Sequence, residues 1–226
     1  MTGTAAASQF PPSDLMGVLA SVPLAPVTAR NTSPRQDAWS AAHTLITGRQ
    51  NASPRRLEAP GPSPAQLAGM FALAAAAPDH GCLIPWRFVV VPDAKRVLLA
   101  EAFALALIDR DPGATLDQIE AAREKAYRAP LLMLAIAVLA HGPEEIPATE
   151  KLVSLGAAIQ NLLIGAHASG FGAGLSSGRS ITSTRICALF GLMEGEVPVC
   201  FIAIGTPMRS REPRERPRPE MFVTTL

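Results

Sequence analysis

Residues 152–178 contain no Asp, Glu, Lys or Arg, and this uncharged stretch restricts the fold more than any other feature of the chain. A membrane-spanning helix needs about 20 predominantly apolar residues. Here Ser154, Asn161 and His167 interrupt the apolar pattern, and a soluble helix that is buried all round carries such polar groups more readily. We therefore predict a buried helix over 148–168 and no membrane association.

The remaining patterns predict an α+β fold with a small central mixed or antiparallel sheet flanked by helices. Residues 131–139 form an apolar run that is typical of a strand covered on both faces. The start signals are Asp37, Asp93 and Thr182 as N-caps, and capping boxes at Ser63 and Thr115. The predicted helices cover 37–47, 64–77, 94–108, 115–128, 148–168 and 182–191, the predicted strands cover 86–91, 131–139 and 197–204, and 172–178 forms a loop or short strand. A central apolar helix with so few strands to cover it predicts dimerisation.

Length and composition place the chain among single-domain proteins with an extension. We expect residues 1–36, rich in Ala, Pro, Ser and Thr, to form an extended or loosely ordered arm, and residues 37–226 to form the domain. The formal charge of +1 gives no case for nucleic-acid or anionic-membrane binding. The three cysteines form no C-x-x-C pair and residues 1–7 lack a signal-peptide pattern, which predicts a cytoplasmic location. The four histidines lack metal-ligand spacing, so we expect no metal.

Residues 77–91 carry the most informative motif. A helix stops at Pro78, a polar loop with Asp79 and His80 follows, and a Pro-Trp step opens a strand. A second loop, 172–178, is rich in glycine, but its spacing differs from G-x-G-x-x-G and it follows a helix. A Rossmann dinucleotide site is therefore not predicted.

These motifs, in this order, resemble the compact subgroup of the nitroreductase family over residues 40–226. The resemblance is carried by 77–88, by Gly-Phe-Gly at 170–172, by Gly-Thr-Pro at 205–207 and by Phe-Val-Thr at 222–224. It implies a nitroreductase-like fold in which FMN lies at the interface of a homodimer, with contacts from both chains. The long central helix is then expected to lie in that interface.

The resemblance also implies the residues that would hold the cofactor. Arg49, Gln50 and Asn51 stand where relatives have Arg-Arg-Ser, which binds the FMN phosphate and ribityl chain, and a guanidinium suits phosphate because of its bidentate geometry. Relatives often use a basic residue after Gly-Thr-Pro for the phosphate, so Arg209 is a candidate, as are Arg211 and Arg214. The alternative for all these residues is a solvated basic loop or tail.

Two further segments would meet the flavin itself. Pro78 and His80 would lie at the flavin edge, where the imidazole can bond cofactor oxygens, while Asp79 caps the turn. Leu175, Ser176 and Ser177 stand where relatives show Trp-Arg-Ser, along the flavin ring. Small residues in that loop permit close approach of the backbone. The chain departs from the family at Gln50, Ala76, Ile84 and the Leu175-Ser176 pair.

The implied activity is an FMN-dependent oxidoreductase that uses NAD(P)H to reduce nitroaromatic, quinone or similar acceptors by ping-pong hydride transfer. No catalytic acid or base is assigned, because the cofactor carries the chemistry. The departures at the cofactor contacts motivate an alternative: a nitroreductase-fold protein that binds flavin or acts as a scaffold without reductase turnover. Retention of FMN and its bleaching by NAD(P)H would separate the two hypotheses.

Overall fold

The computed structural model describes residues 35–140, 142, 145–209 and 215–226. Residues 1–34 of the predicted arm, which spans 1–36, therefore lie outside the described residues. The helices are α2 (Arg35–Gly48), α3 (Pro64–Ala75), α4 (Arg96–Arg110), α5 (Leu116–Arg123), α6 (Ala148–Ala168) and α7 (Thr184–Leu189). The strands are β1 (Leu57–Glu58), β2 (Trp86–Val90), β3 (Leu131–Val138), β4 (Gly172–Ser176) and β5 (Glu196–Pro207). Short 3₁₀ turns are η1 (Pro54–Arg56), η2 (His80–Cys82), η3 (Asp93–Lys95), η4 (Glu124–Tyr127) and η5 (Pro219–Met221).

The five strands form one small antiparallel sheet around β5. Strand β5 pairs with β1, β3 and β4, and β3 pairs with β2 on its other side. The register places Leu134 of β3 between Phe201 of β5 and Val89 of β2. The predicted fold class is confirmed. Strand β1 was missed, because two residues are too few to show any alternation of apolar and polar side chains.

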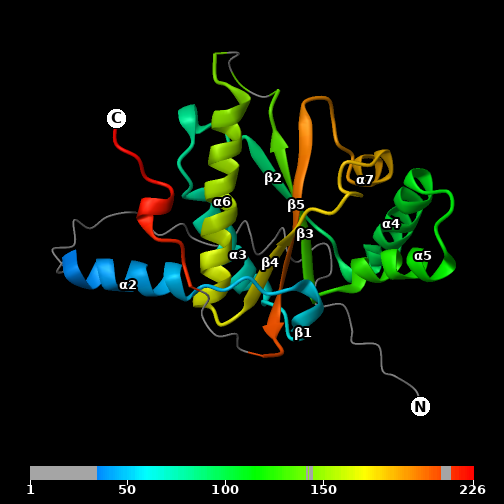
Figure 1. Cartoon of the computed structure of the whole chain (residues 1–226), viewed down its shortest axis with the longest axis horizontal. Helices are drawn as coiled ribbons and strands as arrows, with labels where there is room; N and C mark the ends of the chain where they lie inside the picture. The colour runs from blue at the N-terminus through cyan, green and yellow to red at the C-terminus, as the bar shows by residue number, and fades with distance from the viewer. Residues whose placement is uncertain (1–34, 141, 143–144, 210–214) are drawn as a thin grey trace.

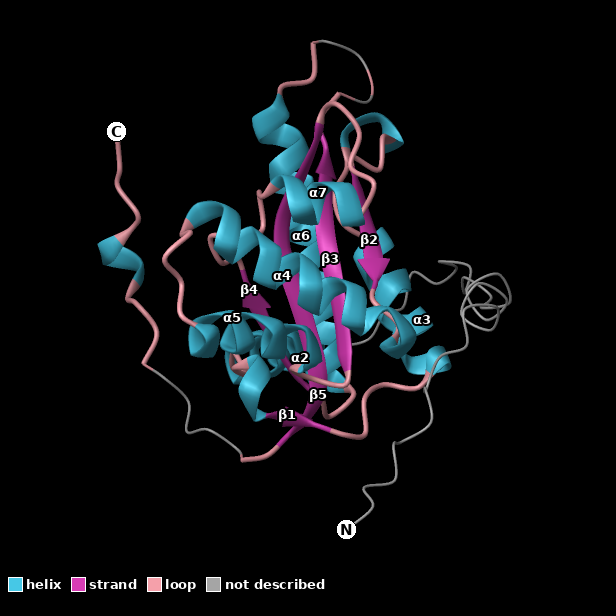
Figure 2. Ribbon diagram, turned by 90° about the vertical axis from the view of Figure 1, so that its right-hand side faces the viewer, coloured by secondary structure: helices cyan, strands magenta, loops and turns pink. Residues whose placement is uncertain are grey.

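Helices cover both faces of the sheet, as Figure 1 and Figure 2 show. Helices α3 and α6 lie on one face, and α4, α5 and α7 lie on the other. Strand β3 packs against both layers: Met133 and Ala135 belong to the α3/α6 core, whereas Leu132 and Leu134 belong to the α4/α5 core. Successive side chains point to opposite faces of a strand. The run at 131–139 is therefore apolar throughout because β3 is covered on both faces, as predicted from the sequence.

Two of the predicted helix starts are formed as expected. The Ser63 hydroxyl accepts from the Gln66 N–H at 3.3 Å, and the Gln66 side chain accepts from the Ser63 N–H at 2.9 Å. Thr115 and Gln118 form the same reciprocal pair at the start of α5. Both capping boxes are thus confirmed, and each satisfies two N–H groups that the first turn of a helix leaves unpaired.

Three other predicted caps were wrong. Asp37 lies inside the first turn of α2, which begins at Arg35. Asp93 makes no side-chain capping bond in η3. The cap of α7 is Ser183 and not Thr182, because adjacent hydroxyl residues offer equivalent acceptors and only tertiary packing selects one. The helix predicted over 115–128 also ends early, where α5 tightens into η4.

Helix α6 is buried toward the sheet but not all round, which corrects the prediction of a fully buried helix. Leu155, Ala158 and Leu162 are at most 1% exposed, whereas Val153 on the outer side is 70% exposed. Among the described residues, no helix is both long enough and apolar enough to cross a membrane.

Helix α2 projects from the body of the molecule, and the C-terminal segment ends on the same side (Figure 1). Residues 37–48 of α2 include no buried residue, and Trp39 is 70% exposed. The C-terminal Phe222 is 69% exposed. Exposed apolar groups of this size, gathered on projecting elements, are typical of a protein–protein contact.

Candidate functional site

The segment between α2 and η1, residues 49–53, runs beside strand β4 and borders the cavity that is described next and called the first cavity. The Ala52 N–H donates to the Ala173 carbonyl at 2.8 Å, and Asn51 forms an isolated parallel bridge with Ala173. A Cβ at Gly174 would collide with the Ala52 carbonyl oxygen. Glycine at this position therefore allows the two backbones to approach, and it fixes the direction in which residues 50–53 present their side chains.

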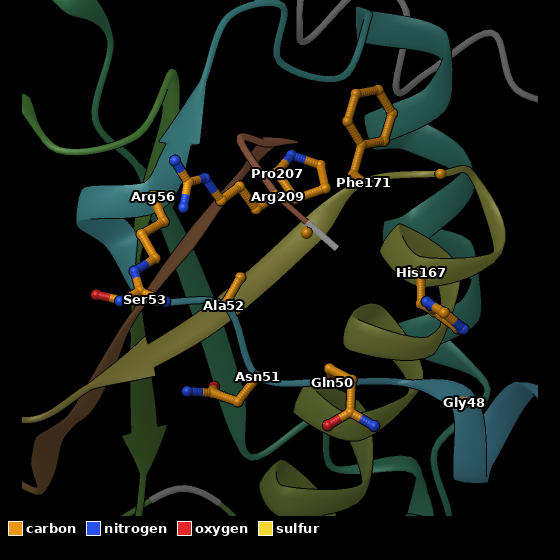
Figure 3. A pocket seen from close by; sticks show the side chains of 12 residues that line it. Gly48, Gln50, Asn51, Ala52, Ser53, Arg56, His167, Phe171, Pro207 and Arg209 are labelled. Carbon is orange, nitrogen blue, oxygen red and sulfur yellow. The ribbon is translucent and has the colours of Figure 1, made fainter. Parts of the chain in front are cut away.

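The first cavity has a volume of about 470 Å³ and gathers polar groups from three parts of the chain. Arg56 and Arg209 lie at one end of it in Figure 3, and His167 lies at the other. The lining residues are Gly48, Gln50, Asn51, Ala52, Ser53, Arg56, His167, Gly170, Phe171, Gly172, Pro207 and Arg209. The structure thus brings together three predicted site residues: Gln50, Asn51 and Arg209.

Residues that sequence reasoning missed also belong to this site. Arg56 lies beside the end of β5, because the Met208 N–H donates to the Arg56 carbonyl at 3.0 Å. Arg216 donates from Nη2 to the Arg49 carbonyl at 2.7 Å. The basic connector 49–56 was a usable signal for Arg56. Nothing in the Pro-, Arg- and Glu-rich tail singles out Arg216. Arg211 and Arg214 lie outside the described residues.

Two neighbouring residues just after α2 bury polar atoms without partners among the described residues: Gln50 lines the first cavity, whereas Arg49 does not. Within the described part of the chain, Arg49 Nε and Gln50 Nε2 are buried and make no hydrogen bond. Burial, followed by the positive charge of Arg216, lowers the pKa of Arg49. Arginine nevertheless stays protonated in proteins. Buried donors of this kind cost about 1–3 kcal/mol each when unpaired, so the geometry suits an incoming anion or hydrogen-bond acceptor.

The loop with Pro78 and His80, which was predicted to contact the flavin, does not line the first cavity. His80 Nδ1 lies 2.7 Å from Glu150 Oε1, in the first turn of α6. His167, at the cavity, belongs to the last turn. With a rise of about 1.5 Å per residue, the helix between Glu150 and His167 is roughly 25 Å long. Within one chain, the His80 loop and the first cavity are therefore at opposite ends of α6.

The His80 loop is held in an unusual conformation. Gly81, Cys82 and Ile84 have positive φ angles of 67°, 55° and 48°. The Asp79 carboxylate accepts from the Ile84 N–H at 2.6 Å, which confirms Asp79 as the residue that closes the turn. Left-handed backbone at non-glycine residues carries strain that persists where surrounding contacts enforce it, often at functional sites.

Leu175, Ser176 and Ser177 lie at the end of β4 and are exposed. The segment 172–178, predicted to be a loop or short strand, is a strand as far as Ser176. Ser176 and Ser53 line a second cavity of about 220 Å³, together with Gly178, Ser180 and Phe201 and with a group of basic residues. Of the predicted flavin-ring segment, Ser176 therefore lines the second cavity, and none of its three residues lines the first. No group of His, Cys, Asp and Glu among the described residues has metal-binding geometry.

The chain belongs to the nitroreductase family, whose model matches residues 49–206. The matched region begins at Arg49 and ends at Thr206, so it spans the segment beside β4, the His80 loop and the whole sheet.

Two curated relatives align over most of the chain. An inferred NAD(P)H nitroreductase of Haemophilus influenzae is 32% identical over 171 residues, which is 76% of this chain and 91% of the relative. YdjA of Escherichia coli strain K12, also an inferred NAD(P)H nitroreductase, is 32% identical over 183 residues, covering 80% of this chain and 96% of YdjA.

Solved structures share the fold at lower identity. A nitroreductase-like family protein from Bacillus cereus superposes with a TM-score of 0.71 at 18% identity, covering 88% of this chain and 98% of the other. The FMN-dependent nitroreductase NfnB from Mycobacterium smegmatis, solved in complex with NADPH, gives a TM-score of 0.64 at 19% identity, covering 84% of this chain and 100% of the other. At these identities the likeness establishes the fold.

Proposed function

We propose that this chain is an FMN-dependent oxidoreductase that uses NAD(P)H to reduce nitroaromatic, quinone or similar small-molecule acceptors. Membership of the nitroreductase family supports the reaction class. The observation that carries the cofactor assignment is the first cavity, where Gln50 Nε2 is buried without a partner among the described residues and Arg56 and Arg209 line the wall.

The residues of the first cavity fit the phosphate and ribityl end of FMN. A phosphate dianion would accept charge-assisted bonds, which are the stronger kind, from the guanidinium groups of Arg56 and Arg209 at one end of the cavity. Arg49, next to Gln50 in the sequence, would donate to another cofactor oxygen. Asn51 and Gln50 suit the ribityl hydroxyls, because an amide both donates and accepts. The flavin ring would then extend toward Leu175, Ser176 and Ser177.

A homodimer completes the site in this proposal. The partner subunit's His80 would reach the cofactor if two copies pack their α6 helices in opposite directions, because His80 and the first cavity lie at opposite ends of that helix. A two-fold interface is self-complementary and repeats each contact twice. Exposed Val153 on α6 and Trp39 on α2 are the apolar groups that such an interface would cover.

FMN, when bound, would supply the hydride-transfer chemistry between NAD(P)H and a small-molecule acceptor, in a ping-pong order. The chain supplies binding and orientation: cations at the phosphate, backbone amides of residues 175–177 beside the ring, and His80 held by Glu150. A mechanism with one shared binding space predicts parallel lines in double-reciprocal plots of rate against donor and acceptor.

The proposal is tested with a visible absorbance spectrum of protein loaded with FMN and desalted, repeated under anaerobic conditions with NADPH and then NADH. We expect a retained yellow spectrum that bleaches and recovers on adding a quinone. A retained spectrum that neither donor bleaches would support a flavin-binding protein without turnover. Loss of colour on desalting would contradict the cofactor assignment.

A further inference from the structure

A second basic cluster lies apart from the first cavity. Arg55 in η1, Lys125 in η4 and Arg128 just after η4 all line the second cavity, together with Ser53, Ser176 and Ser180. Arg55 and Arg128 also line an adjoining shallow cavity. The cations come from parts of the chain about 70 positions apart in sequence, so tertiary folding has gathered them in a protein with a formal charge of only +1.

The cluster has no carboxylate partner in the described residues. Arg87, Arg123 and Arg185 pair with Glu or Asp at 2.7–3.1 Å, whereas Arg55, Lys125 and Arg128 form no such pair in the part of the chain that the structure describes. One of them is partly enclosed: Arg128 Nη2 is buried and makes no hydrogen bond. Like charges that face each other without a counterion are unfavourable.

The electrostatics of the cluster agree with this geometry. Burial first, and then the charges of Arg128, Arg110 and Arg55, lower the pKa of Lys125. Burial and the charge of Arg55 lower the pKa of Arg128, which Glu124 only partly offsets. A bound anion would reverse both shifts. The hydroxyl groups of Ser53, Ser176 and Ser180 add uncharged hydrogen-bond donors to this cavity. Cations and hydroxyl groups together suit phosphate oxygens.

We propose that Arg55, Lys125 and Arg128 bind a nucleotide phosphate group, and that this group is the 2′-phosphate that distinguishes NADPH from NADH. The choice of source rests on the proposed function. The FMN phosphate is assigned to the first cavity, and Ser53 and Ser176 join the second cavity to the segments proposed to contact flavin. A donor whose nicotinamide reaches the flavin could place its adenosine end here, so the enzyme prefers NADPH.

The kinetic test uses the FMN-loaded protein with Arg55→Gln, Lys125→Gln and Arg128→Gln. Loss of one charge-assisted bond is expected to raise KM for NADPH about tenfold and to leave KM for NADH within about twofold. Arg123→Gln on α5 is the matched control, because Arg123 pairs with Glu101 away from the cavity. Arg55 and Lys125 are exposed, so their variants keep the test valid if Arg128→Gln does not fold.

A binding measurement separates this site from the activity. Adenosine 2′-phosphate should bind the FMN-loaded wild-type protein more tightly than adenosine 5′-phosphate, and each of the three variants should remove the difference. If no donor supports turnover but this binding persists, the proposed function fails and the phosphate site stands. Equal binding of the two nucleotides, equal KM changes for NADPH and NADH, or loss of FMN from the variants would overturn the phosphate assignment.

Discussion

Arg96 on α4 and the Arg49–Gln50 segment both bury polar side chains, but they differ in how many of the buried nitrogens have hydrogen-bond partners. Arg96 is 3% exposed, and its Nη1 and Nη2 donate to the carbonyl oxygens of Ala126 and Pro130 at 2.7 and 3.1 Å, whereas its Nε lies 3.9 Å from Asp93 Oδ1 and makes no hydrogen bond to the described residues. Arg49 Nε and Gln50 Nε2 are buried without any partner in the described structure. Burial with partners stabilises the fold, whereas burial without partners costs stability unless a ligand supplies them.

The largest expected effect is that of replacing Arg96, and it is an effect on the free energy of unfolding. Arg96→Ala would remove the donor that bonds the carbonyl oxygens of Ala126 and Pro130 and would open a cavity, so we expect the free energy of unfolding to fall by about 3 kcal/mol. Urea denaturation followed by circular dichroism measures the change. FMN affinity per folded molecule should not change. A loss below about 0.5 kcal/mol would mean that Arg96 is not a structural cation.

Arg49→Ala should show the reverse behaviour. Without the guanidinium, FMN affinity is expected to weaken by about 10- to 100-fold, since a hydrogen bond to a charged group contributes roughly 1.5–3 kcal/mol. The free energy of unfolding of the cofactor-free protein should stay the same or rise. Flavin-fluorescence titration measures affinity, with Arg123→Gln as the control for lost charge. A large loss of apo-protein stability with unchanged affinity would reverse the contrast.

The buried thiol of Cys200 makes the free energy of unfolding depend on pH. Burial raises the pKa of Cys200 to about 11, so the folded state holds this proton more tightly than the unfolded state. The corresponding stability is fully present below the unfolded thiol's pKa and is lost as pH rises toward 11. Cys200→Ala should therefore flatten the decline in unfolding free energy above pH 9, measured by urea titrations at several pH values. An identical decline in both proteins would contradict this attribution.

The smallest effect belongs to the His80–Glu150 pair. The side chains are 60% and 42% exposed, so solvent screening should limit their coupling to stability to less than about 1 kcal/mol. A double-mutant cycle with His80→Ala and Glu150→Ala measures it by thermal unfolding. In the proposed site the same variants should reduce the rate of flavin reduction, because Glu150 orients the imidazole. Larger coupling to stability than to flavin reduction would make the pair structural.

The sheet and its covering helices were predictable because their signals are local. Capping boxes at Ser63 and Thr115 and the apolar run at 131–139 determine their elements with little help from distant residues. The site was only partly predictable. Gln50, Asn51 and Arg209 meet in one cavity, but their meeting with Arg56 and Arg216 depends on how β5 and the tail return to α2. No local pattern encodes such a return.

The separation of His80 from the first cavity was also not predictable from local sequence, because it depends on where α6 places its two ends. Sequence order places both segments in the site through family resemblance, yet one chain holds them at opposite ends of α6. A homodimer would reunite them. The sequence signal for such a dimer is the apolar outer face of α6, where the single chain leaves Leu152 40% and Val153 70% exposed.

The central claim is that the first cavity binds a phosphate through Arg56 and Arg209. Comparison of FMN with riboflavin tests it most directly, because the two flavins differ only in that phosphate. We expect fluorescence titration to give at least about 100-fold tighter binding of FMN, and Arg209→Gln to narrow this ratio to roughly tenfold or less. Equal affinities for FMN and riboflavin in the wild-type protein would contradict the account.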